Sequence, residues 1–376
     1  MAPPELLPYE AGLWDRVGPV WEQLLANTRQ KTAFLSSDWV GAWIEVFGHT
    51  LRPVAVVWRD SEREPVGCAL IPRGRGRFGP FPVHRSFLNA SGVGQIGCEH
   101  NDLLALPTFR DRVLWDLVRM VLRNGTDEFA LEGLSEQTAR DLASRWPLRA
   151  TQGFLSDAPY VDLERLRAAE SRHLACLSSN TRGQIRRSLG LYEKKFGPLS
   201  LEVAERRQVP AWFDQMVALH ERRWTAKGHP GAFATEASRR FHRSVLERSA
   251  GSTEPDRLAA DVVRVRFGDE IVGFLYNLRF HGHVSFYQSG LRYNGDPRLK
   301  PGLVAHHLAI EHYLDQGESE YDFLGGEPEP VRYKRSLTTD VRRLAWIRLP
   351  APGPKMRLLA ALSRGRHRAR SVLAKE

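Results

Sequence analysis

Three acidic residues stand where a carboxylate could take a proton from a substrate. Asp322 lies between Tyr321 and Phe323 in an apolar run typical of a strand, so its side chain points away from both rings. Burial there would raise its pKa into a range useful for a general base. Glu327 follows two glycines in a predicted loop, and Asp102 ends a run of three polar residues. The structural alternatives are a buried hydrogen bond for Asp322, a solvated acid for Glu327 and a backbone-bonded turn for Asp102.

Other polar residues could bind a substrate or donate a proton. Tyr333 is the candidate proton donor, and Lys334 with Arg335 beside it would suit a phosphate or carboxylate group. His100 and Asn101 come directly before the acid at position 102 and would form with it the rim of a pocket. Packing of the tyrosine ring and simple solvation of the two cations are the alternatives.

A strand, a loop, a helix and a second strand are predicted in that order over residues 284–337. The helix begins at Pro301-Gly302, and proline is favoured in the first turn of a helix. The first N–H groups of a helix are unpaired and partly positive, so an anion can bind there. Lys300 and Arg298 add positive charge just before that point. We therefore predict that this stretch binds an anionic cofactor.

The sequence does not predict a metal site. His306, His307 and His312 lie on one predicted helix, but no two of them are four residues apart. Adjacent residues on a helix point about 100° apart, so neighbouring histidines are poorly placed to share one ion. The sequence also contains neither a Gly-x-Ser-x-Gly elbow nor a phosphate-binding Walker sequence.

Length and composition indicate a globular protein of two domains with an affinity for anions. The chain has 376 residues, which is more than one compact core usually holds. Its net charge of +10 favours nucleotide cofactors, RNA, acidic lipids or acidic substrates, unless it reflects a general bias toward arginine. No apolar run reaches the length of a membrane span, the N-terminus lacks a signal-peptide pattern, and the three cysteines are scattered. We therefore expect a cytoplasmic protein without integral membrane segments.

The two halves of the chain repeat one order of elements. Glu64–Leu70 aligns with Glu270–Tyr276, and in each half two glycines eight residues apart bracket a later strand. The glycine pairs are Gly125 with Gly133 and Gly317 with Gly325. Internal similarity of this kind indicates a duplicated architecture. The predicted fold class is α/β (α+β), with two tandem units that are each a mixed, mostly antiparallel sheet flanked by helices.

The predicted domains are residues 1–165, residues 166–350 and a basic C-terminal tail at 351–376. Arg73–Arg77 alternates arginine with glycine, and we interpret it as a basic loop between strands rather than an RNA-binding element. A long basic helix is predicted over Arg172–Lys195. The tail is interpreted as a docked or frayed helix, with contact to an anionic membrane surface or RNA as the alternative.

Several blocks in the second half resemble one family. These blocks are Arg182–Arg187, Arg223-Trp224, Tyr287–Gly290, Lys300–Gly302, Asp322–Gly326 and Tyr333–Arg335. In this order they resemble the CelD-like acetyltransferases of the GNAT superfamily. Phe34–Trp39 and Asn101–Leu104 resemble the N-terminal region of the same family. The tandem arrangement also resembles Fem-type transferases, which use aminoacyl-tRNA and carry two GNAT-like domains.

The resemblance implies transfer of an acyl group to an amine. The co-substrate would be acetyl-CoA or another acyl-CoA, and the acceptor would be an amine of a small molecule or saccharide. In such enzymes backbone N–H groups polarise the thioester carbonyl where the fourth and fifth strands splay apart, which here corresponds to 287–290 and 321–324. The implied cofactor-binding residues are Gln288, Ser289, Gly290, Lys300, Pro301 and Gly302. Trp224 is an implied substrate contact.

One departure from the usual pattern keeps two alternatives open. The usual pyrophosphate loop has the form Arg/Gln-x-x-Gly-x-Gly/Ala, whereas Asp296–Gly302 has a single glycine and leaves the backbone less room near a pyrophosphate. This loop, the net charge and the basic helix favour a Fem-like transferase that uses aminoacyl-tRNA. The other alternative is a non-catalytic GNAT pair that binds RNA or a membrane.

Overall fold

The computed structural model describes residues 3–28, 31–123, 125–150, 152–254, 256–325, 332–359 and 361. The elements of the first half are β1 (Glu5–Pro8), α1 (Leu13–Ala26), η1 (Ala33–Leu35), α2 (Ser37–Leu51), β2 (Val54–Arg59), β3 (Pro65–Ile71), β4 (Arg73–Phe78), β5 (Phe81–Phe87), β6 (Leu104–Ala105), η2 (Pro107–Phe109), α3 (Arg110–Arg123), β7 (Glu128–Ser135) and α4 (Glu136–Arg145). The elements that follow are β8 (Gln152–Asp162), α5 (Leu163–Ala168), α6 (His173–Cys176), α7 (Ser179–Phe196), β9 (Leu199–Val203), α8 (Val209–Thr225), α9 (Glu236–Ser249), β10 (Ala259–Phe267), β11 (Glu270–Phe280), β12 (His283–Leu291), α10 (Pro301–Asp315), β13 (Glu320–Asp322), α11 (Arg332–Arg335) and β14 (Asp340–Pro350).

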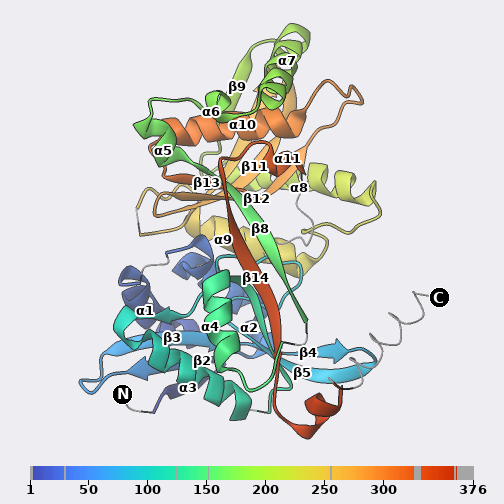
Figure 1. Cartoon of the computed structure of the whole chain (residues 1–376). Coiled ribbons are helices and arrows are strands. Elements are labelled where there is room, and N and C mark those ends of the chain that lie inside the picture. Colours follow the sequence, from blue (N-terminus) through green and yellow to red (C-terminus); the bar gives the residue numbers. More distant parts are fainter. Residues whose placement is uncertain are drawn as a thin grey trace, which may run out of the picture.

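The strands form two sheets, and the larger sheet runs through both halves. Its order is β4-β5-β7-β14-β8-β13-β12-β11-β10-β9, and the smaller sheet has the order β1-β2-β3-β6. The long strands β8 and β14 pair side by side and join the halves (Figure 1). The predicted boundary at residue 165 falls in α5, directly after β8. The domain limits themselves stay a prediction.

Each half contains the duplicated unit that the sequence indicated. The strands β2 and β3 form an antiparallel pair, as β10 and β11 do. A helix then crosses to a later strand, α3 in the first half and α10 in the second. Gly125, Gly133 and Gly317 adopt positive φ beside these later strands, a conformation that favours glycine.

Side-chain caps and prolines fix where the helices begin. Ser36, Ser135, Ser178 and Thr235 each accept a hydrogen bond from the backbone N–H three residues on, at the start of α2, α4, α7 and α9. The predicted basic helix over 172–195 is therefore two helices, because Ser178 caps α7 and the chain is extended at Leu177. Proline opens α10, as predicted.

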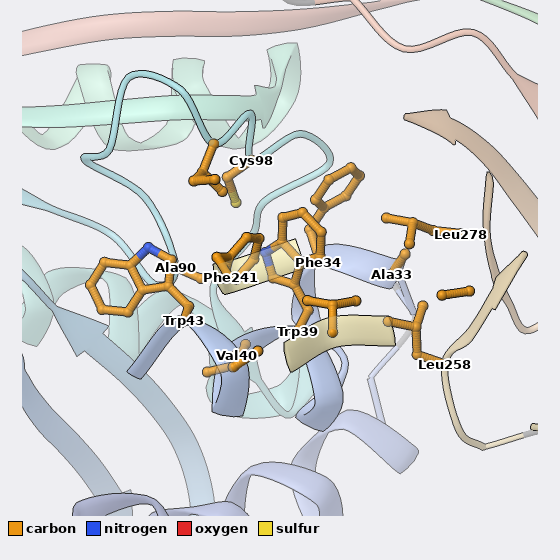
Figure 2. Packing of buried hydrophobic residues seen from close by; sticks show 14 of the residues in the cluster. Ala33, Phe34, Trp39, Val40, Trp43, Ala90, Cys98, Phe241, Leu258 and Leu278 are labelled. Atoms are coloured by element: carbon orange, nitrogen blue, oxygen red, sulfur yellow. The ribbon is translucent and has the colours of Figure 1, made fainter. Parts of the chain in front are cut away.

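A core of aromatic side chains holds the two halves together. Trp39 on α2 is fully buried, and its ring meets Phe34, Phe241 of α9 and Tyr287 of β12 at centroid distances of 5.0, 4.8 and 5.4 Å. Figure 2 shows Trp39 and Phe241 in this cluster together with Cys98, which lies in the long loop after β5. The first half therefore packs directly against the sheet and helices of the second.

The predicted loop at Arg73–Arg77 is wrong, because this segment is strand β4. It pairs in register with β5, from Arg73 opposite Ser86 to Phe78 opposite Phe81. Near the C-terminus a helical turn at 354–359 packs Met356 and Leu359 onto Val83 of the same hairpin. The tail beyond residue 361 lies outside the described residues.

Candidate active site

A cavity of about 800 Å³ lies where the two halves meet. The loop after β5 contributes Gly94, Gln95, Gly97 and Glu99 to its lining. The second half contributes the end of α8 with the segment 229–232, strand β12 from Phe286 to Ser289, and the chain after β13. Neither half could form this cavity alone.

Two strands of the second half splay apart at the wall of the cavity. The parallel pairing of β12 with β13 covers only His283–Ser285 and Glu320–Asp322. Beyond Ser285 the strands diverge, and a register shift between β11 and β12 leaves Tyr287 without a partner position. From the sequence we predicted that the strands splay apart at 287–290 and 321–324. In the structure β12 diverges after Ser285, one residue earlier than predicted, and β13 diverges after Asp322.

Among the described residues, Glu99 is the one carboxylate that lines this cavity. Its side chain is 6% exposed, and it accepts a hydrogen bond from the Gly325 N–H at 2.5 Å. Burial raises its pKa to about 7, although the Gly325 N–H and the charges of His100 and Lys334 act in the opposite direction. A carboxyl that titrates near neutrality is suited to general base catalysis. Sequence reasoning missed Glu99, although it directly precedes the polar run that begins at His100.

Asp322 and His100 form a buried ion pair beside the cavity. The distance from His100 Nε2 to Asp322 Oδ2 is 2.9 Å, and Asp322 Oδ1 accepts a hydrogen bond from the Leu324 N–H at 2.6 Å. Burial acts to raise the pKa of Asp322, but the charges of His100 and Arg342 outweigh it and lower the pKa. For His100, burial acts to lower the pKa, but Asp322 outweighs it and raises the pKa. The expected rise in the pKa of Asp322 is therefore wrong, and neither side chain lines the cavity.

Asp102 and Asn101 are buried structural residues of the first half, and their predicted place on a pocket rim is wrong. Asp102 Oδ1 accepts hydrogen bonds from Arg110 at 2.7 Å, from the Leu103 N–H at 2.8 Å and from the Thr138 hydroxyl at 3.1 Å. Asn101 donates to the Leu88 carbonyl at 2.9 Å. These bonds tie the loop after β5 to α3 and α4. Neither residue lines the cavity.

Of the three site residues predicted at positions 333–335, two line the cavity and one does not. Tyr333 and Lys334 line the cavity, and Lys334 Nζ donates a hydrogen bond to the Phe323 carbonyl at 2.8 Å. Arg335 instead pairs with Asp157 at 2.6 Å and lines no part of the cavity. Glu327 lies outside the described residues.

A second cavity of about 310 Å³ opens at the start of α10. Lys300, Pro301 and Gly302 line it, and Tyr293 with Tyr333 line both cavities, so the two adjoin. No side chain caps this helix end, although the Lys300 N–H donates to the Ser188 hydroxyl at 2.9 Å. An anion could therefore bind here.

Part of the predicted positive charge at the second cavity is already neutralised. Arg298 pairs with Asp296 at 2.8 Å, so it offers less charge to a ligand than the sequence suggested. Lys300 forms no ion pair within the described residues and is the cation left at this helix end. This arrangement concentrates the expected recognition of an anion on one side chain.

Of the ligand contacts that the resemblance implied on β12 and α8, three line the large cavity and one does not. Gln288, Ser289 and Trp224 line the large cavity. Gly290 instead lies against α8, where a Cβ atom would stand 2.2 Å from the Met216 carbonyl oxygen. Its role is thus close packing of helix on strand rather than contact with a ligand.

The wall formed by α8 is cationic and aromatic. The Arg223 guanidinium lies 4.2 Å from the Tyr293 ring centroid, and the Lys227 ammonium lies 5.1 Å from the Trp224 ring. His220 Nδ1 lies 2.9 Å from the Ser289 carbonyl, and its Nε2 accepts from the Ala232 N–H. Burial lowers the pKa of His220, which keeps the ring neutral. The cavity thus combines cations on the α8 wall with the protonatable Glu99 carboxyl.

Comparison with known protein families gives a match in the second half of the chain. Residues 179–335 match the model of a family described as an acetyltransferase (GNAT) domain. This part of the chain is thus similar to a GNAT domain, in agreement with the resemblance given from the sequence. No curated protein matches the chain.

Solved structures match the chain along nearly its whole length. The C-terminal domain of a putative lysylphosphatidylglycerol synthetase from Agrobacterium fabrum is 15% identical with a TM-score of 0.53, covering 92% of this chain and 95% of that one. FemX is 8% identical with a TM-score of 0.56, covering 91% and 97%. A protein of unknown function from Bacteroides thetaiotaomicron is 10% identical with a TM-score of 0.55, covering 91% and 99%. At these identities the likeness shows the fold, and the predicted fold class of two tandem GNAT-like units is confirmed.

The described residues include neither a metal-binding cluster nor a membrane-spanning helix. They contain no group of three or more histidine, cysteine, aspartate or glutamate side chains placed to hold a metal ion. No helix among them is long and apolar enough to cross a membrane.

Proposed function

We propose that the chain is an N-acyltransferase that moves an acyl group, most simply acetyl, from acyl-CoA to an amine of a small molecule or saccharide. The observation that carries this proposal is Glu99, a buried carboxyl with a pKa of about 7 in a cavity beside the splayed strands of a GNAT domain. The acceptor amine would lie beside Glu99. The donor would enter from the cavity at the start of α10.

The chemistry assigns a task to each side chain. Glu99 takes a proton from the acceptor ammonium, and the neutral amine then attacks the thioester carbon. Backbone N–H groups at the splay stabilise the negative charge on the carbonyl oxygen. As the carbon–sulfur bond breaks, the thiolate leaves and takes a proton from the Tyr333 hydroxyl, which water restores. Lys300 and the first N–H groups of α10 hold the donor's phosphates.

Binding of coenzyme A should depend on Lys300. We expect Lys300→Glu to weaken binding of acetyl-CoA about 10- to 100-fold, because one charge-assisted hydrogen bond is replaced by repulsion. Isothermal titration calorimetry on both proteins measures this directly. Lys194→Glu makes the same change of charge at an exposed site on α7 that lines neither cavity, and it should bind as the unaltered protein does. Equal weakening by both variants would contradict the proposed donor site.

A second candidate function is transfer from aminoacyl-tRNA. The fold of FemX matches over 91% of this chain, and Arg298 is already neutralised by Asp296 at the expected pyrophosphate site. Calorimetry with charged tRNA in place of acetyl-CoA separates the two donors. Saturable binding of tRNA alone, with a steep salt dependence, would favour this second function. Binding of neither donor would favour the non-catalytic alternative.

A further inference from the structure

The β4–β5 hairpin carries a row of arginines that the proposed reaction does not use. β4 is the edge strand of the ten-stranded sheet, at the opposite end from β9 (Figure 1). Arg73, Arg75 and Arg77 alternate with glycines along it, and all three are exposed. Alternate residues of a strand project from the same face at a spacing of about 7 Å, so the three guanidinium groups form one line.

The glycines are explained by packing on the other face of the hairpin. A Cβ atom at Gly76 would stand 2.6 Å from the guanidinium of Arg85, and one at Gly74 would stand 3.2 Å from the ring of Phe87. Arg85 itself is neutralised, because it forms an ion pair with Glu128 at 2.7 Å. This face therefore belongs to the fold, and the glycines need no functional explanation.

The face that carries the three arginines, in contrast, keeps its positive charge. Its cross-strand neighbours are Ser86 opposite Arg73, His84 opposite Arg75 and Pro82 opposite Arg77, and none of these is acidic. The nearby Asp127 carboxylate already accepts from the His84 N–H and pairs with Lys355. Within the described part of the chain none of the three arginines forms an ion pair, and Arg77 donates only to the Pro80 carbonyl. Three like charges in a row repel one another, and an anionic partner with evenly spaced charges would relieve that repulsion.

We infer that the arginine row on β4 binds the phosphodiester backbone of a nucleic acid strand. A line of phosphates matches a line of guanidinium groups, each of which can bond two phosphate oxygens. A bilayer surface is the less suitable partner, because the phenylalanines at the tip of the hairpin, Phe78 and Phe81, lie on the opposite face from the arginines. A row of charges on an edge strand also hinders pairing between sheets, which is the role left if no nucleic acid binds.

Fluorescence anisotropy with a labelled 20-nucleotide RNA, and with DNA of the same sequence, tests this inference. The variant is Arg73→Ala, Arg75→Ala and Arg77→Ala combined. We expect its Kd at about 50 mM salt to rise at least tenfold, and the slope of log K against log salt to become shallower by about 2, as for three lost contacts to a single strand. RNA bound more tightly than DNA would show that the 2′-hydroxyl contributes.

The matched control removes the same charge elsewhere. Arg16→Ala, Arg112→Ala and Arg207→Ala combined remove three exposed cations from α1, α3 and the turn before α8. Equal losses in the two triple variants would show only a general effect of charge and would overturn the inference. So would unchanged binding in the β4 variant, or a loss of binding to phosphatidylglycerol vesicles without a loss of RNA binding. Thermal melts of both variants confirm that they are folded, and none of these outcomes depends on the acyltransfer proposal.

Discussion

We expect Glu99→Gln to reduce kcat/KM for acyl transfer by about 10²- to 10⁴-fold, the usual contribution of a general base. Glutamine keeps the size of the side chain and can still accept the hydrogen bond from the Gly325 N–H. The substitution removes only the capacity to take a proton. A thiol-release assay with acetyl-CoA and a responsive amine would measure the effect.

The pH dependence gives the same prediction a second readout. Because the pKa of Glu99 is about 7, its carboxylate form increases as pH rises through that value. The rate should therefore rise with pH across neutrality in the unaltered protein, and this rising limb of the pH–rate profile should disappear in Glu99→Gln. Persistence of the limb in the variant would assign it to another group.

Glu132 provides a matched control for this substitution. It lies in the first half, accepts a hydrogen bond from the Gly92 N–H at 3.1 Å, and burial raises its pKa as well. It does not line the cavity. Glu132→Gln should therefore leave the rate and its pH limb nearly unchanged. An equal loss in both variants would point to disturbance of the loop after β5 rather than to loss of a base.

Replacement of Trp39 by alanine should lower the free energy of unfolding by about 3–5 kcal/mol, as expected for a large side chain deleted from a core. Trp39 is fully buried between elements of both halves, so the cavity left behind would weaken the packing of each half against the other. Urea unfolding followed by circular dichroism measures the change. Trp115→Ala removes a ring that is 44% exposed and should cost far less.

The Trp39 substitution should also affect the active site. Trp39 packs on Tyr287, and the Tyr287 hydroxyl accepts a hydrogen bond from the Gly97 N–H, two residues before Glu99. Loss of the indole should therefore disturb the loop that carries Glu99 and reduce activity in the fraction that stays folded. Full activity in the folded variant would show that the loop keeps its position without this packing.

The repeated fold was predictable because its signals are local. Alternating apolar residues mark the strands, and prolines and glycines mark where the helices and later strands begin and end. The same local signals gave a wrong result at Arg73–Arg77. Its charged and glycine-rich sequence suggests a loop, but pairing with β5 makes it a strand.

The candidate site was less predictable because its properties arise from distant residues. The low pKa of Asp322 depends on His100, which lies more than 200 positions earlier in the chain. The raised pKa of Glu99 depends on burial between the two halves, which outweighs the opposing effect of the Gly325 N–H. The spacing of residues along the sequence does not predict contacts between segments so far apart. The residues around 300 and 333 were found because their helix end and their aromatic–basic cluster are visible locally.

The most direct test of the proposed function is product formation from isotopically labelled acetyl-CoA. Small-molecule extract would be incubated with the unaltered protein, with Glu99→Gln and with Glu132→Gln, and amines of increased mass would be measured by mass spectrometry. We predict a labelled amide from the unaltered protein and from Glu132→Gln, and at least a 100-fold smaller yield from Glu99→Gln. A labelled product formed equally well by Glu99→Gln would contradict the assignment of the base. The absence of any product, together with no binding of acetyl-CoA, would contradict the proposed donor.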